Sequence, residues 1–142
     1  MSEKILLVDD ETDFLEVMSE RMGARGMEVT TAESAQKALQ EVEKGGFDAI
    51  VLDLMMPGMD GLETLKKIKE KRPALQVILL SGHATLEKGI EAMKLGAMDF
   101  IEKPADINEL TDKIRKAKAQ KMVLVEEEME SKLKSIINAK GW

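Results

Sequence analysis

Five polar residues each stand at, or just beyond, the end of a short apolar segment, and their types suit phosphoryl chemistry. They are Asp9, Asp10, Asp53, Ser81 and Lys103. Three neighbouring carboxylates repel one another unless a cation joins them, and Mg²⁺ takes hard oxygen ligands and often binds beside a phosphate. With the cation bound, Asp53 can stay ionised and attack phosphorus. Lys103 and Ser81 would then neutralise and hydrogen-bond the phosphoryl oxygens, so the set predicts a site that makes and holds an aspartyl phosphate.

These residues converge only if the apolar segments are strands of one sheet. Residues 5–8, 27–30, 49–52, 77–80 and 98–101 are the predicted strands. Three of them are apolar throughout, which is typical of parallel strands buried on both faces. Amphipathic helical periods separate them. Five repeats of strand and helix predict an α/β fold with a doubly wound, five-stranded parallel sheet and helices on both faces.

The expected strand order is flavodoxin-like, 2-1-3-4-5. In doubly wound sheets, ligands bind in the crevice at the carboxyl ends of the strands, where the strand order reverses. Neighbouring first and third strands would bring the three aspartates together. The fourth and fifth strands would bring Ser81 and Lys103 to the opposite wall. One crevice is therefore expected to collect all five residues.

Composition restricts the classes of function. The 142 residues suit one domain, and the net charge of -6 works against binding to duplex DNA. No apolar stretch reaches the ~18 residues that a membrane span needs. The first residues lack the features of a signal peptide, so a cytoplasmic location is expected. The absence of cysteine excludes a thiolate metal site.

The last helix is predicted to be unusually long, because helical composition runs from near Asp106 to about Ala139. Its second half carries apolar residues at heptad-like steps: Met122, Val125, Met129, Leu133 and Ile136. A sustained coiled coil needs roughly three to four heptads, and this segment supplies fewer. Two interpretations stay open, a solvated helix packed on its own domain and a dimer seam or partner-docking helix. The expected division is a domain over 1–118 and a C-terminal helical extension over 119–142.

Four segments resemble the motifs of response-regulator receiver domains of two-component signal transduction, the CheY-like family. They are LVDDE at 7–11, LDLMMPGMDG at 52–61, LSGH at 80–83 and FIEKP at 100–104. The resemblance covers about residues 4–118, with all four motifs in order. It implies the same doubly wound fold that the strand pattern predicts.

The resemblance also implies a role for the acidic residues. Asp53 matches the phosphoacceptor, Asp10 the direct magnesium ligand, and Asp9 a ligand that acts largely through water. The Met55 carbonyl, with Asp53, would complete the protein ligands of Mg²⁺. In receivers the positions of Met55 and His83 tune the loss of the phosphoryl group to water, and a bulky Met55 is expected to obstruct that water.

The remaining motif residues match the phosphate-binding and switching positions. Lys103 resembles the phosphate-binding lysine, and its bond to Pro104 is expected to be cis. Ser81 and Phe100 resemble the switch pair, in which the hydroxyl moves toward the phosphate and the aromatic ring turns inward. Simpler roles stay open: a helix cap for Ser81, a surface charge for Lys103 and core packing for Phe100.

A receiver domain implies a phosphorylation-dependent switch rather than an ordinary enzyme. It would accept a phosphoryl group from a sensor histidine kinase or a phosphotransfer protein, and would catalyse only this transfer and a slow autodephosphorylation. Output would pass through protein contacts with an unknown downstream target, without nucleic acid or membrane. A homodimer through the C-terminal helix, or through the face of the fourth helix, fifth strand and fifth helix, is a further candidate.

Two other functions are compatible with parts of this pattern. A magnesium-dependent phosphohydrolase that resembles the haloacid dehalogenase family also uses an aspartate nucleophile, but there the nucleophile follows the first strand in an Asp-x-Asp arrangement. Here that position holds Asp9-Asp10, and the length leaves no room for a cap domain. The second alternative, a receiver-shaped interaction module that is never phosphorylated, is disfavoured by the intact set of site residues.

Overall fold

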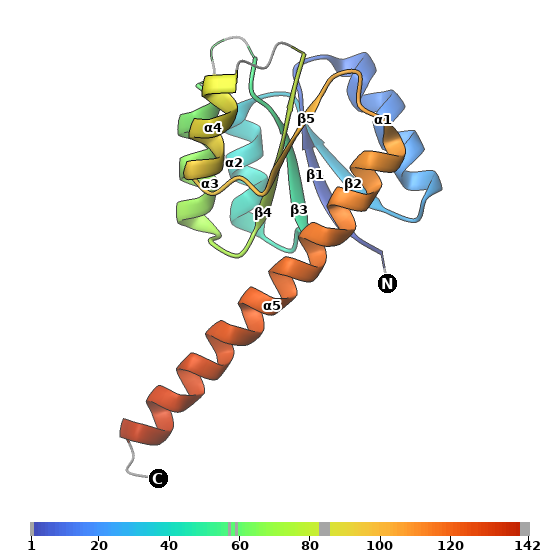
Figure 1. Cartoon of the computed structure of the whole chain (residues 1–142). Coiled ribbons are helices and arrows are strands. Elements are labelled where there is room, and N and C mark those ends of the chain that lie inside the picture. The colour runs from blue at the N-terminus through green and yellow to red at the C-terminus, as the bar shows by residue number, and fades with distance from the viewer. Residues whose placement is uncertain (1, 57, 59, 83–85, 140–142) are drawn as a thin grey trace.

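The computed structural model describes residues 2–56, 58, 60–82 and 86–139. Strands and helices alternate along the chain (Figure 1). The strands are β1 (Lys4–Val8), β2 (Glu28–Ala32), β3 (Ala49–Asp53), β4 (Gln76–Ser81) and β5 (Asp99–Glu102). The helices are α1 (Thr12–Ala24), α2 (Ala35–Lys44), α3 (Gly61–Lys71), α4 (Leu86–Lys94) and α5 (Ile107–Ala139).

All strand pairs in the sheet are parallel, and the order is β2-β1-β3-β4-β5. Helices α1 and α5 cover one face, and α2, α3 and α4 cover the other (Figure 1). Val8 stands beside Leu52 in the register of β1 and β3, which brings the ends of these strands together. The predicted doubly wound fold and its flavodoxin-like order are confirmed.

Apolar runs become central strands because they fill two cores at once. Successive side chains of a strand point to opposite faces of the sheet. Leu6 and Val8 lie in the core under α2, α3 and α4, whereas Ile5 and Leu7 lie in the core under α1 and α5. The more polar β2 forms an edge of the sheet, as the expected strand order predicted.

The start of α3 is defined by a cap and by a close approach of the backbone. The Asp60 carboxylate accepts hydrogen bonds from the backbone N–H groups of Leu62 and Glu63 at 3.1 and 3.2 Å, which satisfies donors left free at a helix start. A Cβ atom on Gly61 would lie 2.8 Å from the Leu54 carbonyl oxygen. Only glycine therefore fits where α3 begins against the segment that follows β3.

The residues of helix α5 that are buried on the domain lie in its first turns. Its buried residues are Leu110, Thr111, Ile114 and Ala117. Beyond them the helix continues away from the sheet as one rod (Figure 1). The five apolar residues of the predicted stripe are 36% to 65% exposed, which disfavours the interpretation that they pack on their own domain and favours the other one, a dimer seam or partner-docking helix. No helix within the described ranges is long and apolar enough to cross a membrane.

Candidate functional site

The crevice at the carboxyl ends of β1 and β3 collects the three predicted aspartates. Asp9 follows β1 and is fully buried, Asp53 ends β3 and is 3% exposed, and Asp10 is exposed to solvent. One carboxylate oxygen from each of the three lies within 4.8 Å of the other two. The parallel register of the two strands produces this convergence, as the topology predicted.

Lys103, just past β5, closes the crevice with its ammonium group. Its Nζ lies 2.6 Å from Asp9 Oδ2, 3.3 Å from Asp53 Oδ2 and 3.3 Å from Glu11 Oε1. Burial by itself lowers the pKa of Lys103, but the Asp9 and Asp53 carboxylates outweigh it and hold that pKa above its ordinary value. The ammonium therefore stays charged, and Lys103 is a site residue rather than a solvated surface cation.

Backbone groups orient the two buried carboxylates. The Glu11 N–H donates to Asp9 Oδ1 at 2.9 Å, and the Met55 N–H donates to Asp53 Oδ1 at 2.9 Å. Each carboxylate thereby turns its other oxygen toward Lys103. The contact of Lys103 with Asp9 is an ion pair without hydrogen-bond alignment, so the buried Asp9 Oδ2 has no hydrogen-bond partner among the described residues.

The donor set fits a divalent cation. Asp9, Asp10, Glu11 and Asp53 bring four carboxylates to one ammonium, which leaves negative charge in excess. Their oxygens are the hard ligands that Mg²⁺ prefers, and a buried acceptor without a hydrogen bond stands among them. Met55 lies at the rim directly after β3, and the part of its carbonyl as a metal ligand stays a prediction.

The other predicted residues lie along the same edge of the sheet. Ser81 ends β4 and is 1% exposed, and its backbone carbonyl accepts a hydrogen bond of 2.8 Å from the Lys103 N–H. Phe100 on β5 is half-buried against the core under α2, α3 and α4. The Lys103–Pro104 bond is cis, as predicted. Movement of Ser81 and Phe100 stays a prediction, and His83 lies outside the described residues.

Two contacts of Lys103 were not predicted from the sequence. Glu11 reaches its ammonium, and the Phe14 ring centroid lies 4.6 Å from the same Nζ, within cation–π range. Glu11 directly follows the acidic pair in the sequence, so its place beside the crevice could have been predicted. Phe14 could be assigned only to the apolar face of a helix, so nothing in the sequence connected it to a lysine so distant along the chain.

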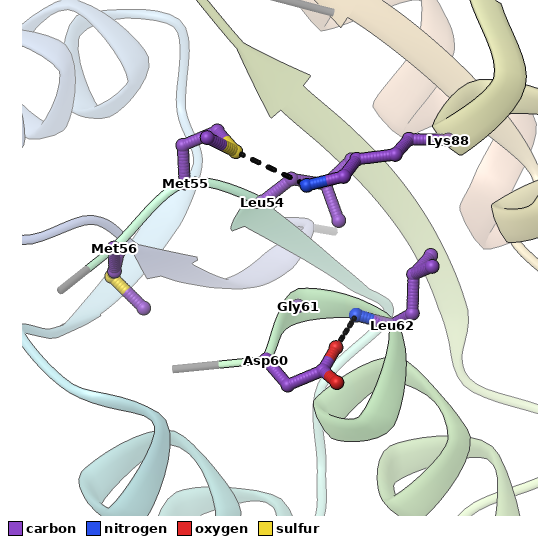
Figure 2. Close-up of a pocket in the computed structure, with 7 residues that line it drawn as sticks. All are labelled: Leu54, Met55, Met56, Asp60, Gly61, Leu62 and Lys88. Atoms are coloured by element: carbon purple, nitrogen blue, oxygen red, sulfur yellow. Dashed lines mark hydrogen bonds between the residues drawn. The ribbon is translucent and has the colours of Figure 1, made fainter. Parts of the chain in front are cut away.

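A pocket of about 620 Å³ adjoins the crevice between the segment after β3 and the start of α4. Figure 2 shows Met55 and Lys88 pointing toward one another, with Lys88 Nζ 3.8 Å from Met55 Sδ. The Met55 side chain is 51% exposed there. The obstruction of water by Met55 stays a prediction.

The fold and the site define a protein of the doubly wound class with an acidic, lysine-closed crevice. Residues 5–115 match the family described as the response regulator receiver domain, and the chain belongs to this family. It is 36% identical over 115 residues to the transcriptional regulatory protein ZraR of Escherichia coli strain K12, an alignment that covers 81% of this chain and 26% of ZraR. The chain thus spans about a quarter of the length of such curated relatives.

Solved structures agree with this assignment. A response regulator receiver domain protein from Clostridium thermocellum is 34% identical, with a TM-score of 0.82 over 86% of this chain and 98% of that one. The beryllofluoride-activated NtrC4 receiver domain dimer is 31% identical, with a TM-score of 0.78 over 83% of this chain and 98% of that one. Fold and family are therefore shown together.

Proposed function

We propose that this receiver domain is a signalling switch that accepts a phosphoryl group on Asp53 in a Mg²⁺-dependent reaction. The donor would be a sensor histidine kinase or a phosphotransfer protein. The observation that carries the proposal is the pairing of a buried, oriented Asp53 carboxylate with the Lys103 ammonium at 3.3 Å, beside two further aspartates. A nucleophile, a cation for the phosphoryl oxygens and ligands for a metal therefore occur in one crevice.

The chain's own residues would act in sequence during the transfer. The Met55 N–H holds Asp53 Oδ1, and Oδ2, which faces Lys103 at 3.3 Å, would attack phosphorus in line with the leaving group. The bond from Oδ2 to phosphorus forms as the bond to the donor breaks, and the donor leaves with the electron pair. Lys103 shifts from the carboxylates to the new phosphoryl oxygens. Mg²⁺, held by Asp9, Asp10, Asp53 and the Met55 carbonyl, would neutralise the remaining charge.

Output would follow from Ser81 and Phe100. Ser81 ends the strand beside β5, and a hydrogen bond from its hydroxyl to the phosphate would favour one arrangement of the β4 end over another. Phe100 lies partly buried on the adjoining strand, packed against the core under α2, α3 and α4, and its ring would turn inward from there. The two residues together would carry the phosphorylation state from the crevice to the surface of α4, β5 and α5.

That surface is suited to protein contacts. Ile90, Met93 and Leu95 are 47%, 46% and 38% exposed along α4 and its end. On the neighbouring helix α5, Lys113 is ion-paired with Asp99 of β5. We propose that a downstream protein binds this face and that the chain works in the cytoplasm. The net charge of -6 supports protein rather than nucleic acid as the direct partner.

Mass spectrometry after incubation with acetyl phosphate and Mg²⁺ tests the proposal. One added phosphoryl group is expected, and it should be absent from the Asp53→Asn variant and from samples without Mg²⁺. Steady release of phosphate from many esters would instead favour a phosphohydrolase. If no adduct forms, and beryllofluoride with Mg²⁺ leaves the NMR signals of Ser81 and Phe100 unchanged, the chain is an interaction module that is not phosphorylated.

A further inference from the structure

The second half of α5 carries an apolar stripe that its own domain leaves exposed. The exposed fractions are 55% for Met122, 36% for Val125, 65% for Met129, 57% for Leu133 and 51% for Ile136. With 3.6 residues per turn, these five side chains lie along one side of the helix. Large side chains that are exposed singly need no explanation, but a continuous row on a helix indicates a covering partner.

The domain fixes where this stripe begins. The Lys121 ammonium donates a hydrogen bond to the Phe47 carbonyl just before β3, and Val125 lines a groove beside Phe47 and Leu75. Val125 is accordingly the least exposed member of the stripe. From Met129 onward the helix extends beyond the sheet (Figure 1). The helix therefore leaves the domain as a continuous rod, with the stripe open to a second molecule.

We propose that a second copy of this chain covers the stripe, with the two α5 helices parallel and in register. The charges beside the stripe distinguish this arrangement from an antiparallel one. Glu126 and Glu130 lie along one edge of the stripe, and Lys121 and Lys132 lie along the other. Between parallel helices each edge meets the opposite edge of its partner, so acidic residues face basic ones. Between antiparallel helices like edges meet and repel.

Glu128 also lies near the basic edge, but it does not reverse the positive charge of that edge. Glu128 is paired with Lys132 of its own helix at 3.1 Å, which leaves Lys121 as the net charge of that edge. An acidic edge and a basic edge on every copy are self-complementary only under a parallel two-fold arrangement. The stripe and its edges thus identify the partner as the chain itself, because one surface supplies both halves of the match.

The spacing of the stripe bears on the strength and the shape of the dimer. Its members are separated by 3, 4, 4 and 3 residues, so Met122, Met129 and Ile136 keep a seven-residue spacing and Leu133 stands one residue away from it. A seam of five side chains per copy is at the small end of specific interfaces. We therefore expect a dissociation constant on the order of micromolar or weaker, and a dimer that responds to concentration.

Site-directed disulfide formation in the full chain tests the orientation, because the sequence contains no cysteine. Met129→Cys and Ile136→Cys are made separately, with Glu127→Cys on the opposite side of α5 as the matched control. A parallel, in-register dimer should give covalent dimers at both stripe positions, at least tenfold faster than the control. Cross-linking at only one stripe position indicates antiparallel helices, and equal rates at all three positions overturn the seam itself.

Sedimentation velocity provides an independent readout. Glu126→Lys should weaken dimerisation about threefold or more in a parallel dimer, since it puts a second lysine opposite Lys121. In an antiparallel dimer the same change relieves repulsion between acidic edges and strengthens association. A chain that stays monomeric at several hundred micromolar refutes the proposal. Phosphorylation of Asp53 is measured separately, so failure of the seam and failure of the proposed switch are distinguishable.

Discussion

Replacement of Lys103 by methionine should tighten Mg²⁺ binding, because the lysine ammonium holds the position of a cation among the carboxylates proposed to bind the metal. Its Nζ lies 2.6 Å from Asp9 Oδ2 and 3.3 Å from Asp53 Oδ2, and its side chain is only 15% exposed. Mg²⁺ must displace the ammonium from these oxygens, and the bound ion is then repelled by the ammonium that stays nearby. Lys103→Met keeps the apolar stem and removes the charge, so both penalties disappear.

The magnitude follows from the shorter contact. Two unit charges 2.6 Å apart attract by about 1.6 kcal/mol in bulk water and by several times more inside a protein. For a crevice that opens to solvent we take about 1.5–3 kcal/mol, which corresponds to a roughly 10- to 150-fold lower dissociation constant for Mg²⁺. This gain should appear although we expect the variant, which lacks the cation proposed to bind the phosphoryl group, to accept phosphate poorly.

A Mg²⁺ titration monitored by NMR measures the dissociation constant of the variant and of the unaltered chain. The backbone amides of Glu11 and Met55 report it, since they donate to Asp9 Oδ1 and Asp53 Oδ1. Lys113→Met is the matched control, because Lys113 is also ion-paired but with Asp99 on the output surface. Equal or weaker Mg²⁺ binding by Lys103→Met than by the unaltered chain would refute the competition.

Outcomes are expected for four further substitutions. Gly61→Ala should destabilise the fold by about 1–3 kcal/mol in urea denaturation because its Cβ meets backbone, whereas Gly89→Ala, in open space on α4, should stabilise it by roughly 0.5–1 kcal/mol. Burial by itself raises the pKa of Asp99, but its bonds to Lys113 and to a backbone N–H hold that pKa below its ordinary value. The stabilisation is therefore present at neutral pH and lost as pH falls below about 4 and through the lowered pKa, so Asp99→Asn should cost well under 1 kcal/mol at pH 7 and less in acid. Met55→Ala should speed loss of the phosphoryl group several-fold in a phosphate-release assay, and an unchanged rate would show that Met55 does not obstruct water.

The fold was predictable because strands that fill two cores must be apolar along their whole length. Ile5 to Val8 could be placed in a central strand for this reason, and Asp9 at the mouth of the crevice followed from the topology. The ends of elements were less certain: Met27 packs in the core before β2 rather than within it. The predicted start of this strand is one residue too early, and Met27 is buried in either position.

The parts that could not be predicted depend on contacts between distant side chains. Glu11 and Phe14 surround Lys103 only after the sheet has formed, and periodicity on a single helix contains no information about that neighbour. For Met129 and Ile136, an apolar stripe is equally consistent with burial on a domain or on a partner. The path of α5 decides between them, and this path depends on Lys121 and the turn before β3.

Helix α5 is unbroken from Ile107 to Ala139, so a tilt at its packed end would be transmitted along its whole length. About 33 Å of helix extends past its last buried residue, Ala117, at 1.5 Å per residue. A tilt of about 10° at the packed end would move the far tip by about 6 Å, roughly the pitch of one helical turn. A displacement too small to disturb the core beneath Ile114 would thus become a change of register wherever that tip is held.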